Sequence, residues 1–203
     1  MCPPGDSARA LGLTGSTTAA GASRLPYAHR VEIPGLGAVT EDEYGSLVSA
    51  PIPVPVFGNA ALPFAVDGYA DDPAPEDFHA AIRTFLALDR TVLEDASPAV
   101  FEYYRDMADE FGDDLDDFPA IASPGEVWNH VRFDRHEVSV QRDDDGEPVY
   151  VSVECECAWE PEHGLQIVFR DGARITKVGP FDGHLTNASA YARDDLRDVV
   201  YVR

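Results

Sequence analysis

Apolar and polar residues alternate most regularly between residues 149 and 157. Apolar side chains occupy every second position there, at Val149, Val151, Val153, Cys155 and Cys157. A period of two is typical of a β-strand that buries one face and exposes the other. Two further apolar runs, 164–170 and 173–178, flank Asp171-Gly172, a dipeptide typical of tight hairpin turns. The C-terminal third therefore predicts three antiparallel strands, over 149–157, 164–170 and 173–178.

The middle of the chain carries the period of a helix instead. From Pro75 onward, apolar residues recur three or four positions apart, at Phe78, Ile82, Phe85, Leu86, Val92 and Leu93. Ser97-Pro98 then supplies a cap and a first-turn proline, so a second helix is expected to begin there and to end near residue 112. Ser123 and Glu126 have the spacing of a capping box, which predicts a short third helix.

The N-terminal part is built of shorter pieces. Residues 1–26 are rich in Ser, Thr, Ala and Gly, and we interpret them as a flexible extension. Short β-type runs follow over 29–67, of which the proline-rich run 51–57 belongs at a sheet edge or outside the sheet. One more strand is expected within 191–202. The order strands, helices, strands predicts a single α+β domain over 27–203, with a mostly antiparallel sheet and a helical pair and short third helix packed on one face.

The charge decides which partners are expected. Asp and Glu number 37 against 15 Lys and Arg, which gives a formal net charge of −22, and Lys177 is the sole lysine. Such a chain repels nucleic-acid phosphates and anionic lipid headgroups, so neither nucleic acid nor membrane is expected as a partner. Attraction to a basic protein is favoured, and a merely solvated acidic surface is the alternative.

Cysteine content and hydropathy bear on the compartment. Cys2, Cys155 and Cys157 are too few and too unevenly placed for a disulfide framework. No secretory leader is visible, and no apolar run approaches the roughly 20 residues of a membrane helix, so we expect a cytoplasmic protein with reduced thiols. Cys155 and Cys157 share the register of the valines before them, which predicts that they are buried and free of metal. Metal ligation is the alternative.

The most unusual segment runs from Trp159 to Gly164, Trp-Glu-Pro-Glu-His-Gly, between two strong strands. His163 with Glu160 and Glu162 beside it has the composition of a general base or a metal site. We favour a structural interpretation, in which His163 fixes a tight connection, Gly164 supplies a special dihedral angle and Trp159 belongs to the core.

The loop containing Asp182 and His184 is a second, weaker candidate site, because functional residues are often carried by loops; otherwise it is a turn. Motifs of established enzymes are missing: there is no Gly-x-Ser-x-Gly, no phosphate-binding glycine loop and no His-Glu-x-x-His. An enzyme is therefore disfavoured, and no cofactor is expected.

Several motifs carry a family resemblance. They are Ile52-Pro53-Val54-Pro55-Val56, Asp72-Pro73-Ala74-Pro75-Glu76-Asp77-Phe78 and Gly179-Pro180-Phe181-Asp182-Gly183-His184-Leu185-Thr186-Asn187. Together with the Trp-Glu-x-Glu-His-Gly connection and the Leu-x-Ile-x-Phe strand after it, they resemble a large family of uncharacterised bacterial domains, known as a domain of unknown function. The resemblance spans roughly Val31 to the C-terminus and implies no established activity.

The leading hypothesis is a non-enzymatic domain that binds a basic protein; an immunity-type inhibitor of a toxin is one form of it, by analogy of size and charge. Because surface ion pairs contribute little each, exposed anchors are also needed, and Tyr103, Tyr104 and Phe181 are the candidates. The alternatives are an intracellular accessory or structural domain and a metal-binding protein or enzyme. That last alternative centres on Glu160, Glu162, His163 and His184.

Overall fold

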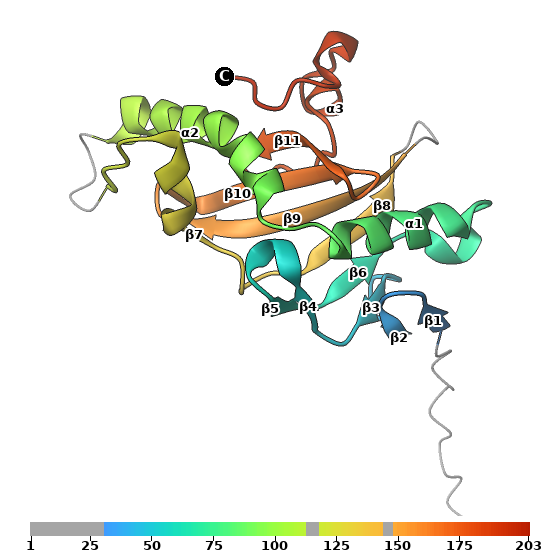
Figure 1. The fold of residues 1–203 in the computed structure, drawn as a ribbon. Coiled ribbons are helices and arrows are strands. Elements are labelled where there is room, and N and C mark those ends of the chain that lie inside the picture. The colour runs from blue at the N-terminus through green and yellow to red at the C-terminus, as the bar shows by residue number, and fades with distance from the viewer. Residues whose placement is uncertain (1–30, 113–117, 144–147) are drawn as a thin grey trace, which may run out of the picture.

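The computed structural model describes residues 31–112, 118–143 and 148–203. Most of the described strands form one sheet in the order β1-β2-β3-β6-β8-β9-β10-β11 (Figure 1). Their bounds in that order are β1 Val31–Ile33, β2 Gly37–Glu41, β3 Leu47–Ser49, β6 Phe64–Val66, β8 Val138–Arg142, β9 Val149–Cys157, β10 Glu160–Arg170 and β11 Arg174–Gly179. β7, Val131–Arg132, pairs with the end of β9. The proline-rich run lies outside this sheet, where β4, Ile52–Val54, forms a hairpin with β5, Ala60–Leu62.

Neighbouring strands of the main sheet are antiparallel, except that β6 and β8 run parallel. Parallel neighbours need a long crossover, and here it contains helices α1, Pro75–Leu86, and α2, Thr91–Phe111. A seven-residue 3-10 helix, Pro124–His130, follows α2, and helix α3, Asn187–Tyr191, follows the last strand. Single-turn 3-10 helices cover Pro55–Phe57, Tyr69–Asp71 and Asp194–Leu196. The fold is α+β with a mostly antiparallel sheet, as predicted.

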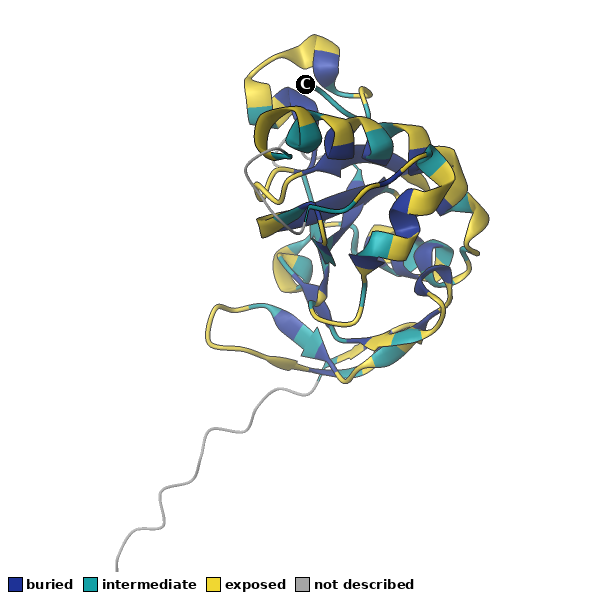
Figure 2. Cartoon of the chain, turned by 90° about the vertical axis from the view of Figure 1, so that its left-hand side faces the viewer, coloured by how far each residue is buried: buried dark blue, intermediate teal, exposed yellow. Residues whose placement is uncertain are grey.

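Helices α1 and α2 cover the same face of the sheet, and the main core lies between them and the strands (Figure 1). Helix α1 buries Phe78 and Phe85, and the Phe85 ring packs edge-on against Phe169 of β10, with 5.0 Å between ring centroids. Helix α2 buries Leu93 and Tyr103. The helical period found in the sequence thus marks the sheet-facing sides, while the outer sides are exposed (Figure 2).

The opposite face of the sheet is also covered at one end. Tyr150 and Ser152 alternate with the valines of β9 and so face away from the helices, yet both are buried. The chain after β11 folds back over this face, where Leu185 packs with Tyr150 and Val168 in a second, smaller apolar cluster. The expectation of a half-buried strand is therefore wrong for the first part of β9. It is correct for the last part, whose two outward-facing glutamates are partly exposed.

The second helix begins earlier than predicted. It starts at Thr91, so Pro98 lies inside the helix rather than in its first turn. The Ser97 hydroxyl does not cap the helix: it donates to the Leu93 carbonyl at 3.1 Å and accepts from the Trp128 indole N–H at 2.7 Å. Ser97 thus serves as a buried bridge between α2 and the 3-10 helix.

The predicted short third helix is present, as a 3-10 helix. One further expectation is wrong: the described residues 191–202 form no strand. Apolar and polar residues do not alternate in the Arg- and Asp-rich part of that segment. The segment contacts the sheet through a backbone hydrogen bond, from the Val178 N–H to the Val200 carbonyl at 2.7 Å. The predicted extension 1–26 lies outside the described residues.

Arg142 connects β8 to the segment that leads into α1. Its guanidinium donates to the Asp72 carboxylate at 2.8 and 3.0 Å and to Asp77 at 2.9 Å. It also lies 5.5 Å from the centre of the Phe78 ring. The hydrogen bond from Arg142 lowers the pKa of Asp72, whose side chain is only 7% exposed.

We expect Arg142→Gln to lower the free energy of unfolding by about 1–3 kcal/mol at neutral pH. The pKa of Asp72 is lower in the folded chain than in the unfolded chain, where Asp titrates near about 3.9. The ion pair therefore stabilises the fold above that value and is lost as the pH falls through the folded pKa. Urea unfolding at neutral pH and in acid should show the difference between wild type and variant shrinking in acid.

The matched control is Arg105→Gln, because Arg105 pairs with Glu102 at 3.5 Å while both side chains are 57% exposed. That change is expected to alter stability by less than about 1 kcal/mol. If the loss in Arg142→Gln were independent of pH, the ion pair with Asp72 would not be its cause.

Candidate functional site

The face of the sheet opposite the helices carries polar side chains on four adjacent strands. Ser139 of β8 pairs with Ser152 of β9, and Val168 of β10 lies between Ser152 and Lys177 of β11. Gln166, two positions before Val168, lies on the same face. Alternation along the strands therefore gathers hydroxyl, amide and ammonium groups on one surface.

Lys177 is the centre of this polar face. Its side chain is 2% exposed, and its ammonium donates to Gln166 Oε1 at 2.9 Å, to the His184 carbonyl at 3.0 Å and to the Asp182 carboxylate. Gln166 in turn donates through Nε2 to Ser152 Oγ at 3.0 Å. Burial lowers the pKa of Lys177, while Asp182 acts in the opposite direction.

The Lys177 contacts define a structural role. An ammonium has three N–H donors, and here three acceptors receive them. The charged group is therefore matched to its surroundings and holds the loop around Asp182 against the sheet. Asp182 also accepts from the His184 N–H at 2.8 Å, so one carboxylate orders both the lysine and the loop backbone. Lys177 thus holds the predicted candidate loop with Asp182 and His184 against the sheet. We refer to these three residues as the Lys177 clamp.

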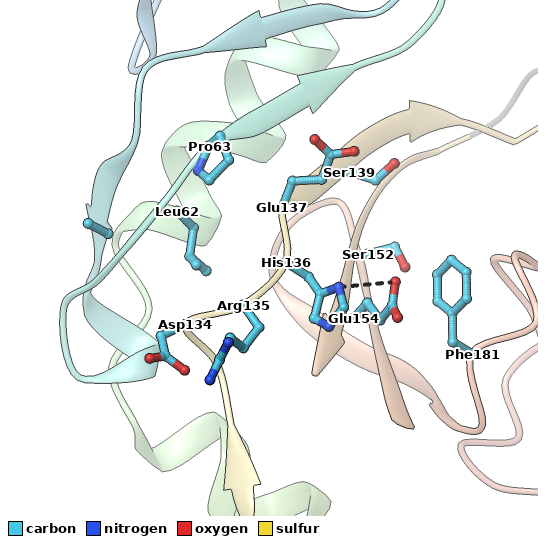
Figure 3. A pocket seen from close by; sticks show the side chains of 11 residues that line it. Leu62, Pro63, Asp134, Arg135, His136, Glu137, Ser139, Ser152, Glu154 and Phe181 are labelled. Atoms are coloured by element: carbon cyan, nitrogen blue, oxygen red, sulfur yellow. Dashed lines mark ion pairs between the residues drawn. The ribbon is translucent and has the colours of Figure 1, made fainter. Parts of the chain in front are cut away.

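A pocket of about 460 Å³ lies beside this clamp (Figure 3). Ser139, Ser152 and Glu154 line it from the sheet, and Phe181 stands at one side with 40% of its surface exposed. His136, from the loop before β8, points toward Glu154 with 3.6 Å between Nδ1 and Oε2. Residues 61–63, at the end of the β4–β5 hairpin, complete the lining.

The charged side chains that line the pocket are predominantly acidic. Asp134, Glu137 and Glu154 contribute three carboxylates against the one guanidinium of Arg135. Arg135 is itself directed to Glu156, 3.9 Å away. Burial, with the carboxylates of Asp42 and Asp67 nearby, raises the pKa of Glu137. A cation that enters this pocket would offset the repulsion between these carboxylates and Glu137.

The Trp159–Gly164 segment forms a bulge next to the pocket. β10 pairs with β9 at Glu160 and again at Leu165, so the residues between leave the ladder. The Glu160 carboxylate accepts from the backbone N–H of Glu162 at 3.1 Å and of His163 at 2.6 Å. Gly164 has φ +65°, and an added Cβ would lie 2.4 Å from the Cys155 carbonyl oxygen. This glycine is required by both its dihedral angle and its close packing.

Two contacts brace the bulge from outside. The buried Tyr103 hydroxyl donates to the Gly164 carbonyl at 3.0 Å, and the Phe181 N–H donates to the His163 carbonyl at 3.2 Å. The structure therefore brings together the two predicted candidate segments, around His163 and around Asp182. The His184 side chain is exposed and does not join the Glu160–His163 cluster.

Three candidate binding residues belong to the core: for Trp159 this was the favoured interpretation, whereas for Tyr103 and Tyr104 the prediction of an exposed anchor is wrong. Trp159 is 1% exposed and packs edge-on against Tyr103 and Tyr104, with 6.1 Å between ring centroids in each pair. Tyr103 and Tyr104 are buried, so they are not exposed anchors. Their place on α2 directs them toward the strands, and the Tyr104 hydroxyl donates to the Pro119 carbonyl at 3.0 Å. Of the three predicted anchors, only Phe181 is exposed.

The predicted burial of the two strand cysteines is confirmed. Cys155 and Cys157 are buried free thiols. Burial raises the pKa of Cys155 well above its ordinary value and that of Cys157 to about 12. The Cys157 thiol donates to the Glu160 carbonyl at 3.5 Å. That they are free of metal stays a prediction.

The sequence interpretation missed most of the pocket: His136, Glu137, Ser139, Ser152 and Glu154. These residues come from separate segments, and none forms a recognisable motif. One signal was available, because Lys177 is the only lysine and stands between Ile175 and Val178 in a predicted strand.

No helix in the described part of the chain is long and apolar enough to cross a membrane. A family model described as "Domain of unknown function (DUF6985)" matches residues 35–185. That range includes the pocket, the bulge and the Lys177 clamp. Comparison with curated proteins and with solved structures found no match.

Proposed function

The chain belongs to the family described as a domain of unknown function, DUF6985, and we propose that it is a non-enzymatic domain that binds a basic protein. The pocket beside Phe181 is the proposed anchoring point for a cationic side chain of that partner. The observation that carries the proposal is an exposed aromatic ring beside a group of carboxylates, in a chain with a net charge of −22.

An arginine side chain of the partner fits this surface best. A guanidinium stacks on an aromatic ring and pairs with a carboxylate through two N–H groups, so Phe181 and Glu154 together offer both contacts. Glu137 adds a carboxylate that forms no ion pair within the described part of the chain, and burial raises its pKa. A bound cation would favour its ionised form.

The acidic surface already pairs with arginine elsewhere. Arg203 lies 3.0 Å from the Asp106 carboxylate and 3.1 Å from Asp109, and Tyr201 donates to Asp106 at 2.8 Å. Arg203 is 74% exposed, and exposed pairs of this kind contribute about 0–1 kcal/mol each. Acidity alone would therefore give weak attraction, which is why the proposal needs the Phe181 pocket as an anchor.

More specifically, we propose that the protein acts in the bacterial cytoplasm as an immunity-type inhibitor of a basic toxin or effector. Two buried thiols that remain reduced support the compartment, and the charge supports the sign of the partner. The alternative is an accessory domain that has no toxin partner and uses the same pocket. Identifying the captured protein distinguishes the two roles.

Binding of a cation in the pocket can be measured with N-acetyl-arginine amide by NMR titration of the full chain. We expect amide shifts centred on Ser152, Glu154 and Phe181, with N-acetyl-glutamate amide producing none. Phe181→Ala should weaken binding by about 2–5-fold, because a cation–π contact at a partly exposed site is worth about 0.5–1 kcal/mol. Tyr44→Ala is the control, since Tyr44 is 85% exposed and outside the pocket lining.

The same variants test the protein partner. Phe181→Ala should weaken the binding of a basic protein that the wild type captures, and Tyr44→Ala should leave its affinity unchanged. Its association rate should fall as ionic strength rises above about 0.15 M, where the Debye length is about 8 Å. An acidic partner, a rate indifferent to salt, or arginine shifts unaffected by Phe181→Ala would refute the proposal.

A further inference from the structure

The bulge places three metal-ligating groups close together. One carboxylate oxygen each of Glu160 and Glu162 and one ring nitrogen of His163 lie within 4.8 Å of one another. The residues are adjacent in sequence, but adjacency does not by itself bring such atoms together. Here the bulge directs the Glu160 carboxylate toward Glu162 and His163, and His163 Nδ1 lies 3.3 Å from Glu160 Oε2.

The three groups differ in how firmly they are held. Glu160 is 13% exposed, and its carboxylate is fixed by the backbone N–H groups of Glu162 and His163. The His163 side chain is 57% exposed and Glu162 is exposed, so both can adjust. Ligands of a tetrahedral zinc ion lie about 2.0–2.2 Å from the metal, a little over 3 Å from one another. Small movements of the exposed Glu162 and His163 side chains toward the fixed Glu160 carboxylate would bring the three ligand atoms to that spacing.

A second pair of groups faces the same cavity from another part of the chain. The cluster lines a pocket of about 350 Å³ that His136 and Glu154 also line. Their imidazole and carboxylate, 3.6 Å apart, come from the loop before β8 and from β9. Two histidines and several carboxylates thus line the cavity, and His136 and Glu154 surround the cluster as outer groups.

We propose that Glu160, Glu162 and His163 form a binding site for one divalent transition-metal cation of the zinc type. One imidazole nitrogen with carboxylate oxygens is a borderline donor set, which suits Zn²⁺ better than the all-oxygen preference of Mg²⁺ or Ca²⁺. No cysteine belongs to the cluster, and Cys157 is buried and donates to the Glu160 carbonyl. The proposal does not depend on the partner proposed above.

Isothermal titration calorimetry of the full chain with ZnCl₂ tests the site, with MgCl₂ as the comparison cation. We expect one Zn²⁺ per chain in this site and no comparable Mg²⁺ binding. His163→Ala and Glu162→Gln should each weaken Zn²⁺ binding on the order of 10–100-fold or more. Because both side chains are exposed, circular dichroism should show that both variants keep the fold.

His184→Ala is the matched control, because its imidazole is exposed and outside the cluster. It should leave the Zn²⁺ affinity unchanged. Co²⁺ substitution provides a second readout, since ligation by nitrogen and oxygen gives no thiolate-to-metal charge-transfer band. Absence of Zn²⁺ binding, binding that survives His163→Ala, or a thiolate band at the tight site would overturn the proposal.

Discussion

Replacing Gly172 with alanine is expected to lower the free energy of unfolding by about 2–4 kcal/mol. Asp171 and Gly172 form the turn between β10 and β11, with φ +53° and +64°. A left-handed conformation costs a non-glycine residue about 1–2 kcal/mol. In addition, a Cβ on Gly172 would lie 2.0 Å from the Ala81 carbonyl oxygen, so helix α1 would have to move off the hairpin.

The two contributions can be separated with a matched glycine. Gly58 also has a left-handed backbone, with φ +68°, but an added Cβ there would meet no atom within 4 Å. Gly58→Ala should therefore show only the conformational cost, and urea unfolding of both variants would give the difference. Equal losses in the two variants would mean that the close contact between the hairpin and α1 does not contribute to the loss of stability in Gly172→Ala.

The same turn illustrates what the sequence reveals and what it does not. Asp171-Gly172 between two apolar runs predicts the hairpin because the turn depends on local dihedral angles. The contact of that turn with Ala81 in α1 was not predictable, since it joins residues about ninety positions apart. The parallel pairing of β6 with β8 is non-local in the same way. Local periodicity thus predicted the three C-terminal strands and a helical pair on one face of the sheet, but not the parallel pairing of β6 with β8 or the contact of the turn with α1.

The candidate site also has one part that could be predicted from the sequence and one part that could not. Glu160, Glu162 and His163 could be identified because they are neighbours in the chain. The Phe181 pocket could not, because its lining comes from residues 61–63, 134–139, 152–154 and Phe181. Tyr103 and Tyr104 were misassigned to the surface for a related reason: an aromatic residue on an amphipathic helix does not reveal which partner it contacts.

Lys177→Met is expected to lower the free energy of unfolding by about 2–4 kcal/mol. The variant has an unbranched side chain of similar length but leaves Gln166 Oε1 and the Asp182 carboxylate without the lysine ammonium, and among the described residues Asp182 keeps only the His184 N–H. Removing one partner of a buried ion pair is costly mainly because the other stays behind, and Asp182 is 35% exposed, which limits the loss. Release of the 181–185 loop should also weaken arginine binding in the Phe181 pocket.

A double-mutant cycle identifies the cause of that loss. In Lys177→Met/Asp182→Asn the unpaired carboxylate is gone, so the double variant should be more stable than the sum of the single losses predicts, by about 1–3 kcal/mol. The sole lysine gives an independent measure in the wild type, because acetylation at Lys177 reports only on this site. Acetylation should be slow in the native protein and should accelerate with urea before or at global unfolding. Strictly additive losses, together with rapid acetylation of the native chain, would show that Lys177 does not hold the loop against the sheet.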